Sequence, residues 1–302
     1  MFLDGVGLGD PDPTNNPLAA ADLPVLTRLV GARPDRLAPP YSTAGSVFRP
    51  VDATLGHDGL PQSATGQTTI LTGLNGADIM SGHYGPWPGP TLTKALLHGT
   101  LFHDGAARKG SALANTYPPP YFASTGRRRR YRPNAPVVAA RAAGVRLRGL
   151  DDYKSGAAVA PDLDGAGLAR REAPALAGMA PAGVAGTAAT LTRLARDHSF
   201  IFVDVWVTDG YGHARDLEGA ASFLTRLDAL LALLVEDPDG PVAVGATLLI
   251  TSDHGNLEDM SVKGHTRNEV PLLAVGPGAD EFGGASSLLD VAPAVRRVVA
   301  GA

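Results

Sequence analysis

The stretch that decides the fold lies near the C-terminal end of the chain and reads Thr247-Leu248-Leu249-Ile250-Thr251-Ser252-Asp253-His254-Gly255-Asn256. A short apolar run is followed directly by a carboxylate and an imidazole, and then by a glycine that favours a turn. In a turn both side chains can reach a single cation, and mixed oxygen and nitrogen ligands suit Mn²⁺ or Zn²⁺. Taken alone, the stretch is equally compatible with a purely structural turn.

Two other apolar runs end in the same way. Phe2-Leu3 precedes Asp4, and the run from Phe200 to Val207 precedes Asp209. The run before Asp4 is so short that the first strand is either unusually short or begins upstream of Met1. Because ligands gather at the carboxyl ends of strands in open α/β sheets, Asp4, Asp209 and Asp253 should lie together at one edge of a sheet.

The segments between these runs have a helical pattern. From Ala220 to Val235, leucines and a phenylalanine recur at three- and four-residue intervals, which is typical of an amphipathic helix. Strands that alternate with such helices predict an α/β fold with a mostly parallel central sheet sandwiched by helices.

Two histidines extend the acidic set. His213 follows Asp209 by four residues, so both side chains share one face if the turn enters a helix. His265 lies in a polar loop, Lys263-Gly264-His265-Thr266-Arg267. Each has a simpler interpretation on its own: Asp209 as the N-cap of a helix, and His265 as a solvated loop residue.

The glycines in Asp4-Gly5-Val6-Gly7-Leu8-Gly9 do not form a dinucleotide-binding motif. The third glycine comes too early for the G-x-G-x-x-G spacing, and the acidic residue expected after a second strand is missing. The dinucleotide interpretation is therefore disfavoured.

A serine at a predicted helix start is the candidate nucleophile. The segment runs Leu60-Pro61-Gln62-Ser63-Ala64-Thr65-Gly66-Gln67-Thr68-Thr69-Ile70-Leu71-Thr72-Gly73. A Pro-x-Ser sequence usually marks a capped helix. The same position also suits catalysis, because a helix N-terminus stabilises an anion and a serine there can carry a phosphoryl group.

Composition narrows the functional classes. The 302 residues are 44% hydrophobic and 19% charged, with a net charge of −4 and no cysteine, which indicates a globular chain without disulfides or thiolate ligands. No apolar run approaches the ~18 residues that a membrane span needs, so we expect a cytoplasmic protein without a membrane partner. Arginines at 127–130 and 132 leave nucleic-acid binding as an alternative of another class, but the negative charge and the single interleaved aromatic, Tyr131, argue against it.

Taken together and in this order, the motifs resemble the alkaline phosphatase superfamily, and most closely its phosphopentomutase and cofactor-independent phosphoglycerate mutase branch. The resemblance rests on four stretches: residues 4–9, Tyr211-Gly212-His213-Ala214-Arg215-Asp216, Asp253-His254-Gly255-Asn256, and residues 265–273. It implies two divalent metal ions, Mn²⁺ or Zn²⁺ with Mg²⁺ as an option. One ion would be held by Asp4, Ser63, Asp253 and His254, and the other by Asp209, His213 and His265.

The resemblance also implies a mechanism. Ser63 lies ten residues before Gly73, the spacing of the nucleophile in related sulfatases and nucleotide pyrophosphatases, and it would form a phosphoserine. The substrate would be a small phosphorylated metabolite such as a sugar phosphate. Transfer back to the substrate would make the chain a phosphomutase, and transfer to water a phosphatase or phosphodiesterase.

Some features depart from that family pattern. Gln67 stands where both mutases carry a histidine, and the middle of the chain is short for a mutase cap. We expect a core formed by residues 1–117 and 186–302 with an inserted cap at 118–185. Gln67, Arg129 and Arg267 are the expected substrate contacts, and the oligomeric state is left open.

Overall fold

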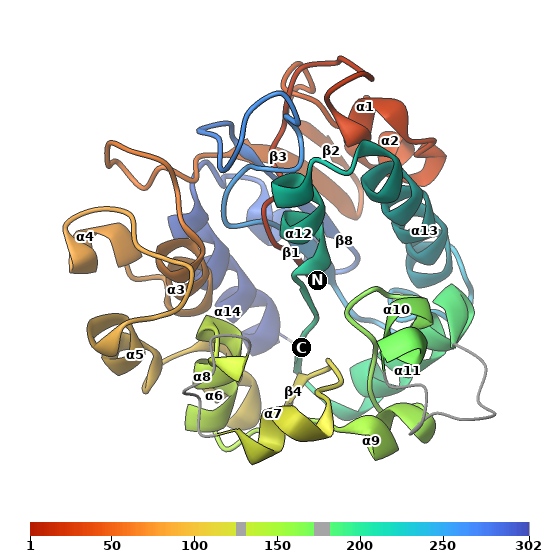
Figure 1. The fold of residues 1–302 in the computed structure, drawn as a ribbon. Helices are drawn as coiled ribbons and strands as arrows, with labels where there is room; N and C mark the ends of the chain where they lie inside the picture. The colour runs from red at the N-terminus through yellow and green to blue at the C-terminus, as the bar shows by residue number, and fades with distance from the viewer. Residues whose placement is uncertain (125–130, 172–181, 302) are drawn as a thin grey trace.

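The computed structural model describes residues 1–124, 131–171 and 182–301 as an α/β fold (Figure 1). A central sheet of six strands has the order β2-β3-β8-β7-β1-β6. Its strands are β1 (Phe2–Leu3), β2 (Tyr41–Thr43), β3 (Ser46–Val51), β6 (Asp204–Val205), β7 (Leu248–Thr251) and β8 (Val270–Val275). A second, two-stranded parallel sheet is formed by β4 (Ser111–Leu113) and β5 (Phe200–Phe202).

The predicted α/β class is confirmed, but the central sheet is mixed where a mostly parallel one was expected. β1 pairs in parallel with both β6 and β7, whereas the pairs β7–β8, β8–β3 and β3–β2 are antiparallel. The reason is the connections, because parallel neighbours need a long crossover whereas antiparallel neighbours do not. β2 and β3 are joined by two residues, Ala44 and Gly45, and Gly45 adopts a left-handed φ of 88° that suits such a turn.

Helices cover both faces of the sheet, as predicted. One apolar cluster packs α3 (Ser63–Thr72), α6 (Leu101–Ala106), α8 (Ala135–Ala142) and α14 (Val291–Gly301) against one face. The other cluster packs α2 (Pro24–Val30), α11 (Gly183–Asp197) and α13 (Leu217–Val235) against the opposite face. The helix predicted over residues 220–235 is α13, and its leucines are buried.

Shorter helices complete the fold. They are α1 (Pro17–Ala20), α4 (Gly76–Met80), α5 (Pro90–Leu96), α7 (Pro119–Ala123), α9 (Leu150–Lys154), α10 (Ala166–Arg171) and α12 (Val207–Ala214), with 3₁₀ turns at Ala279–Phe282 and Leu288–Asp290. None of the helices in the described ranges combines the length and the apolar character needed to cross a membrane.

The segment from 118 to 185, predicted as an inserted cap, contains α7, α8, α9 and α10 and the first turn of α11. Within it, α8 packs against α3 and α5, two helices of the predicted core. The division into core halves and cap stays a prediction. Arg129, an expected substrate contact, and its neighbours at 127, 128 and 130 lie outside the described residues.

Candidate metal centre

Three neighbouring strands bring the predicted ligands to one edge of the sheet. Asp4 follows β1, Asp253 lies two residues after β7, and Asp209 lies in the first turn of α12, which begins soon after β6. β1 pairs in parallel with β6 on one side and with β7 on the other, so the three carboxyl ends point the same way. Residues more than 200 positions apart in the sequence therefore share one site.

The ligand atoms form two overlapping groups. Asp209, His213 and His265 place one ligand atom each within 4.8 Å of one another, and so do Asp4, Asp209 and His254. The sequence assigned Asp209 to the histidine site alone, whereas in the structure its carboxylate lies between the two groups. Asn256 donates from Nδ2 to Asp209 Oδ1 at 2.6 Å, which fixes the orientation of this shared carboxylate.

The histidines are oriented with one ring nitrogen toward the acidic groups. His265 Nδ1 lies 2.7 Å from the Pro61 carbonyl oxygen, which accepts a hydrogen bond only from a protonated Nδ1. In the tautomer with this hydrogen bond, Nε2, 3.9 Å from Asp209 Oδ1, is the nitrogen left to offer a lone pair to a metal ion. His254 is arranged similarly: Nδ1 is 3.3 Å from the Gly255 carbonyl and Nε2 is 3.5 Å from Asp4 Oδ1. Both tautomers suit metal ligation through Nε2.

The electrostatics of the site favour a cation. Burial raises the pKa of Asp253 to about 7, and burial together with the neighbouring carboxylates raises the pKa of Asp4 well above its usual range. Asp4 Oδ1 is buried and has no hydrogen-bond donor. Burial lowers the pKa of His254 to about 3, so this imidazole is neutral at ordinary pH. Buried carboxylates with an unpaired oxygen beside neutral imidazoles form a donor set that fits a divalent transition metal.

Ser63 reaches this centre from the start of α3. Gln62 is the N-cap residue and Ser63 is the first helical residue, so the serine is not the capping side chain. Its hydroxyl lies 3.0 Å from His254 Nε2. The helix can approach this closely because residue 66 is glycine: a Cβ there would lie 2.8 Å from the Asp253 Cβ atom. The hydroxyl is thereby held at the start of a helix whose N-terminal end favours anions.

Two of the expected substrate contacts are described. Gln67 donates from Nε2 to Asp253 Oδ2 at 2.9 Å and, more weakly, to Asp4 Oδ2 at 3.4 Å, while its buried Oε1 has no partner. Gln67 therefore bonds to the ligand carboxylates themselves. Arg267 is exposed and donates to the Gly59 carbonyl in the loop that precedes Ser63. Their roles toward a substrate stay predictions.

A buried glutamate that the sequence analysis missed ties the loops of the centre together. Glu258 is 1% exposed and accepts hydrogen bonds from the backbone N–H groups of Gly7 and Asn256, from the Thr266 hydroxyl and from Asn268 Nδ2. These donors come from the loops that carry Asp4, His254 and His265. The signal was an acidic residue five positions after Asp253, but nothing local indicates that its carboxylate turns inward to meet Gly7, which lies 251 positions away, together with donors from two other loops.

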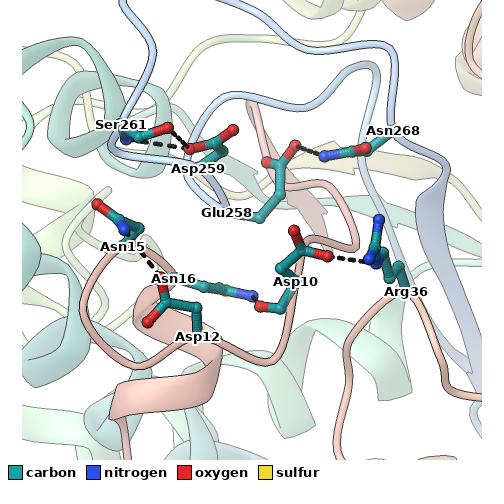
Figure 2. Close-up of a pocket in the computed structure, with 9 residues that line it drawn as sticks. All are labelled: Asp10, Asp12, Asn15, Asn16, Arg36, Glu258, Asp259, Ser261 and Asn268. Carbon is teal, nitrogen blue, oxygen red and sulfur yellow. Dashed lines mark hydrogen bonds and ion pairs between the residues drawn. The ribbon is translucent and has the colours of Figure 1, made fainter.

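Glu258 also lines a polar cavity of about 170 Å³ (Figure 2). The cavity is bordered by Asp10, Asp12, Asn15, Asn16, Arg36, Glu258, Asp259, Ser261 and Asn268. None of these residues belongs to the predicted ligand set, so the cavity is distinct from the metal centre.

Segments of the chain are similar in sequence to curated phosphomutases. Over 110 residues the chain is 37% identical to the phosphopentomutase of Shewanella pealeana, which covers 34% of this chain and 25% of that protein. It is 31% identical over 110 residues to the 2,3-bisphosphoglycerate-independent phosphoglycerate mutase of Methylobacillus flagellatus, covering 34% of this chain and 21% of that one. The matches thus span about a quarter or less of these curated relatives.

The fold as a whole is similar to a solved structure. The alkaline phosphatase of the Antarctic bacterium TAB5 superposes with a TM-score of 0.56 over 99% of this chain and 96% of that one, at 14% sequence identity. The resemblance found in the motifs thus extends to the fold. The profile of the Metalloenzyme superfamily matches residues 1–298, and the chain therefore belongs to the metalloenzyme superfamily.

Proposed function

We propose that this protein is a two-metal phosphoryl-transfer enzyme that uses Ser63 as a nucleophile on a small phosphorylated metabolite such as a sugar phosphate. The observation that carries the proposal is the Ser63 hydroxyl, which lies 3.0 Å from His254 Nε2 beside the two groups formed by Asp4, Asp209, His213, His254 and His265. The similarity to phosphopentomutase and phosphoglycerate mutase segments supports the same chemistry.

The ligands divide between two ions. Asp4, Asp253, His254 and Ser63 would hold one, and Asp209, His213 and His265 the other, with the Asp209 carboxylate near both. When bound, such ions polarise phosphoryl oxygens and lower the pKa of the attacking hydroxyl. The two-imidazole site favours later ions such as Zn²⁺, whereas the oxygen-rich site accepts Mn²⁺ or Mg²⁺.

The chain's own residues supply orientation and charge compensation. α3 directs its N-terminal end toward the place where Ser63 would carry a phosphoryl group, and the Thr65 N–H of that first turn donates to the Tyr84 carbonyl at 3.1 Å. Gln67 donates to Asp253 and Asp4, which keeps these carboxylates in a fixed orientation. The Ser63 proton passes to water as its oxygen bonds to phosphorus; the bond from phosphorus to the leaving oxygen of the substrate breaks on the opposite side, and water protonates that oxygen.

The acceptor of the second step decides between mutase and hydrolase. We favour a phosphomutase-like reaction because segments of the chain are similar to mutases. Release of phosphate to water is the second candidate, which the fold shared with an alkaline phosphatase supports. The two reactions differ in product. Incubation with a pentose phosphate and assay for isomerised sugar phosphate against free phosphate separates them.

The nucleophile is tested with Ser63→Ala. We expect the variant to fold and bind metal but to lose turnover by at least about 1,000-fold on a panel of phosphate mono- and diesters with Mn²⁺, Zn²⁺ or Mg²⁺, since a nucleophile cannot be replaced by its neighbours. Ser46→Ala is the matched control, because Ser46 is also buried but donates to the Leu29 carbonyl far from the centre. Wild-type turnover in Ser63→Ala would exclude a phosphoserine pathway.

A further inference from the structure

Within residues 1–124, 131–171 and 182–301, three buried oxygen atoms without a hydrogen-bond partner belong to residues near the metal centre. They are Asp204 Oδ1 and the hydroxyls of Tyr117 and Tyr121. Their residues are only 0%, 5% and 9% exposed, respectively. A buried tyrosine hydroxyl usually finds a partner, and each unsatisfied polar group lowers the stability of the fold. A group of three such atoms therefore calls for a functional explanation.

The two tyrosines belong to one aromatic cluster, and Asp204 is close enough to act on both electrostatically. The ring centroids of Tyr117 and Tyr121 are 4.7 Å apart, and Tyr117 stacks on Trp206 at 6.4 Å with an angle of 29° between the ring planes. The negative charge of Asp204 acts on both tyrosines and helps to raise their pKa values, although burial is the larger cause. Trp206 is partly exposed, so the cluster is not closed off from the surface.

Strand register connects this cluster to the metal centre. Phe2 lies opposite Asp204 and Leu3 opposite Val205 in the parallel pair β1–β6. Because side chains alternate along a strand, Asp204 projects from the same face as Phe2 and as Asp4, two residues further along. Trp206 is the N-cap of α12, the helix that carries Asp209. The cluster thus adjoins the predicted ligands on one face of the sheet.

Asp204 is held rigidly, yet one of its oxygens is left over. Asn134 Nδ2 donates to Oδ2 at 2.7 Å, and the Asn115 side chain bonds to both the N–H and the carbonyl of Asp204. The described residues provide no ion pair for this carboxylate. A fixed acceptor with a free oxygen beside two phenol groups is arranged to receive hydroxyl groups.

We propose that Tyr117, Tyr121, Asp204 and Trp206 form a subsite for the uncharged, hydroxyl-bearing part of the substrate, a sugar or similar polyol. The inference rests on the proposed phosphoryl-transfer function and names its substrate class. The carboxylate accepts hydrogen bonds from ligand hydroxyls, the phenols both donate and accept, and the aromatic faces cover the C–H surface of the sugar.

The first test measures stability, and it separates a binding role from a structural one. Tyr117→Phe/Tyr121→Phe removes two hydroxyls that have no partner, so the double variant should unfold at a temperature equal to or above that of the wild type. Tyr153→Phe is the matched control. Tyr153 is equally buried, but its hydroxyl accepts a hydrogen bond from the Ala182 N–H at 3.2 Å, so its loss should lower the unfolding temperature. A double variant that unfolds earlier than the wild type would overturn the proposal, because the hydroxyls would then have structural partners.

The second test measures binding of D-ribose to the Zn²⁺-loaded protein by saturation-transfer NMR. We expect transfer from the aromatic protons of the wild type at sugar concentrations up to about 50 mM, a range suited to millimolar dissociation constants. The signal should persist in Tyr153→Phe and vanish in the double variant. No transfer in the wild type, equal transfer in the double variant, or binding of adenine in place of ribose would each overturn the proposal.

These results can be told apart from failure of the proposed function. Ribose carries no phosphoryl group, so its binding should survive in Ser63→Ala. Ribose binding without phosphoryl transfer in the wild type would refute the function and leave the subsite intact. In an active enzyme, the ratio of kcat/KM for ribose phosphate to that for p-nitrophenyl phosphate should fall about tenfold or more in the double variant. An unchanged ratio would overturn the subsite alone.

Discussion

Replacement of Glu258 tests whether the metal centre depends on one buried carboxylate. Oε2 of Glu258 accepts from Gly7 N at 2.9 Å and Asn256 N at 2.8 Å, while Oε1 accepts from the Thr266 hydroxyl and from Asn268 Nδ2 at 2.9 Å. All four groups are donors. An amide in place of the carboxylate cannot accept from all of them.

The size of the effect follows from which donors lose their acceptor. In Glu258→Gln, the NH₂ group can face Thr266, whose hydroxyl can rotate to accept, so that only the Asn268 amide is left unsatisfied. One buried unsatisfied donor costs about 1–3 kcal/mol of unfolding free energy. Glu258→Ala leaves all four donors without their acceptor, and at about 1 kcal/mol or more each the loss is at least about 4 kcal/mol. That is a large part of the ~5–15 kcal/mol that stabilises a typical domain.

The same substitution should weaken metal binding. Gly7 lies three residues after Asp4, Asn256 two after His254, and Thr266 directly after His265. When these loops lose their common acceptor, the ligands are less well oriented, and loss of such support typically lowers metal affinity about 10–100-fold.

Urea unfolding of the chelator-treated protein and calorimetric titration with Mn²⁺ or Zn²⁺ measure the two effects. Asp259→Asn is the matched control, because the neighbouring carboxylate accepts only from Ser261 in its own loop. We expect the free energy of unfolding to be highest for the wild type and Asp259→Asn, lower for Glu258→Gln and lowest for Glu258→Ala. Equal unfolding midpoints for Glu258→Ala and wild type, with unchanged metal affinity, would refute the reasoning.

Two further predictions concern the metal ions. His213→Ala and His265→Ala should each lose one bound ion and most of the turnover, whereas two ions in elemental analysis of both variants would contradict the assigned ligands. The metal-free protein should lose stability between about pH 6.5 and pH 8. Burial raises the pKa values of Asp4 and Asp253, so the folded state binds more protons than the unfolded state. A rise in pH therefore favours the unfolded state. His254 has the opposite effect on the free energy of unfolding, because burial lowers its pKa to about 3 in the folded state. That effect changes with pH only up to about 6.5, the pKa of the imidazole in the unfolded chain. Thermal unfolding in chelator against pH measures this, and a stability that rises over the window would contradict it; saturating Zn²⁺ should abolish the fall.

The sequence predicted the convergence of the ligands because each one follows an apolar run. In parallel neighbours, strand ends meet at one edge, and this placed Asp4, Asp209 and Asp253 together without knowledge of the rest. The antiparallel half of the sheet was not predicted, because nothing local indicates that Val270–Val275 would pair between β7 and β3. Which strands pair depends on the tertiary structure, and an apolar run alone does not specify its neighbours in the sheet.

Asp204 and Glu258 escaped prediction for a related reason. Asp204 lies inside the run from Phe200 to Val207, which the pattern presents as one strand, so nothing marks its carboxylate as a site residue. Glu258 lies in a loop, where acidic residues are common and usually solvated. Both residues are distinguished by their burial: Asp204 is 0% exposed and Glu258 is 1% exposed. This burial arises only when distant segments pack around them.

Buried carboxylate oxygens without a hydrogen-bond donor lower the stability of the fold, and their positions indicate where a ligand would bind. Elsewhere, buried acids are satisfied: Asp228 accepts from the N–H groups of Val25 and Leu26 at the start of α2, and Asp162 accepts from those of Gly165 and Gly167. At the carboxyl edge of β1 and β6, by contrast, Asp4 and Asp204 each keep one buried oxygen without a donor. Because backbone groups satisfy Asp228 and Asp162, whereas one oxygen each of Asp4 and Asp204 has no donor in the described part of the chain, the unpaired oxygens are characteristic of this edge. A cation at Asp4 and a hydroxyl-bearing ligand at Asp204 would complete them, so binding at this edge should stabilise the folded state as well as supply the chemistry.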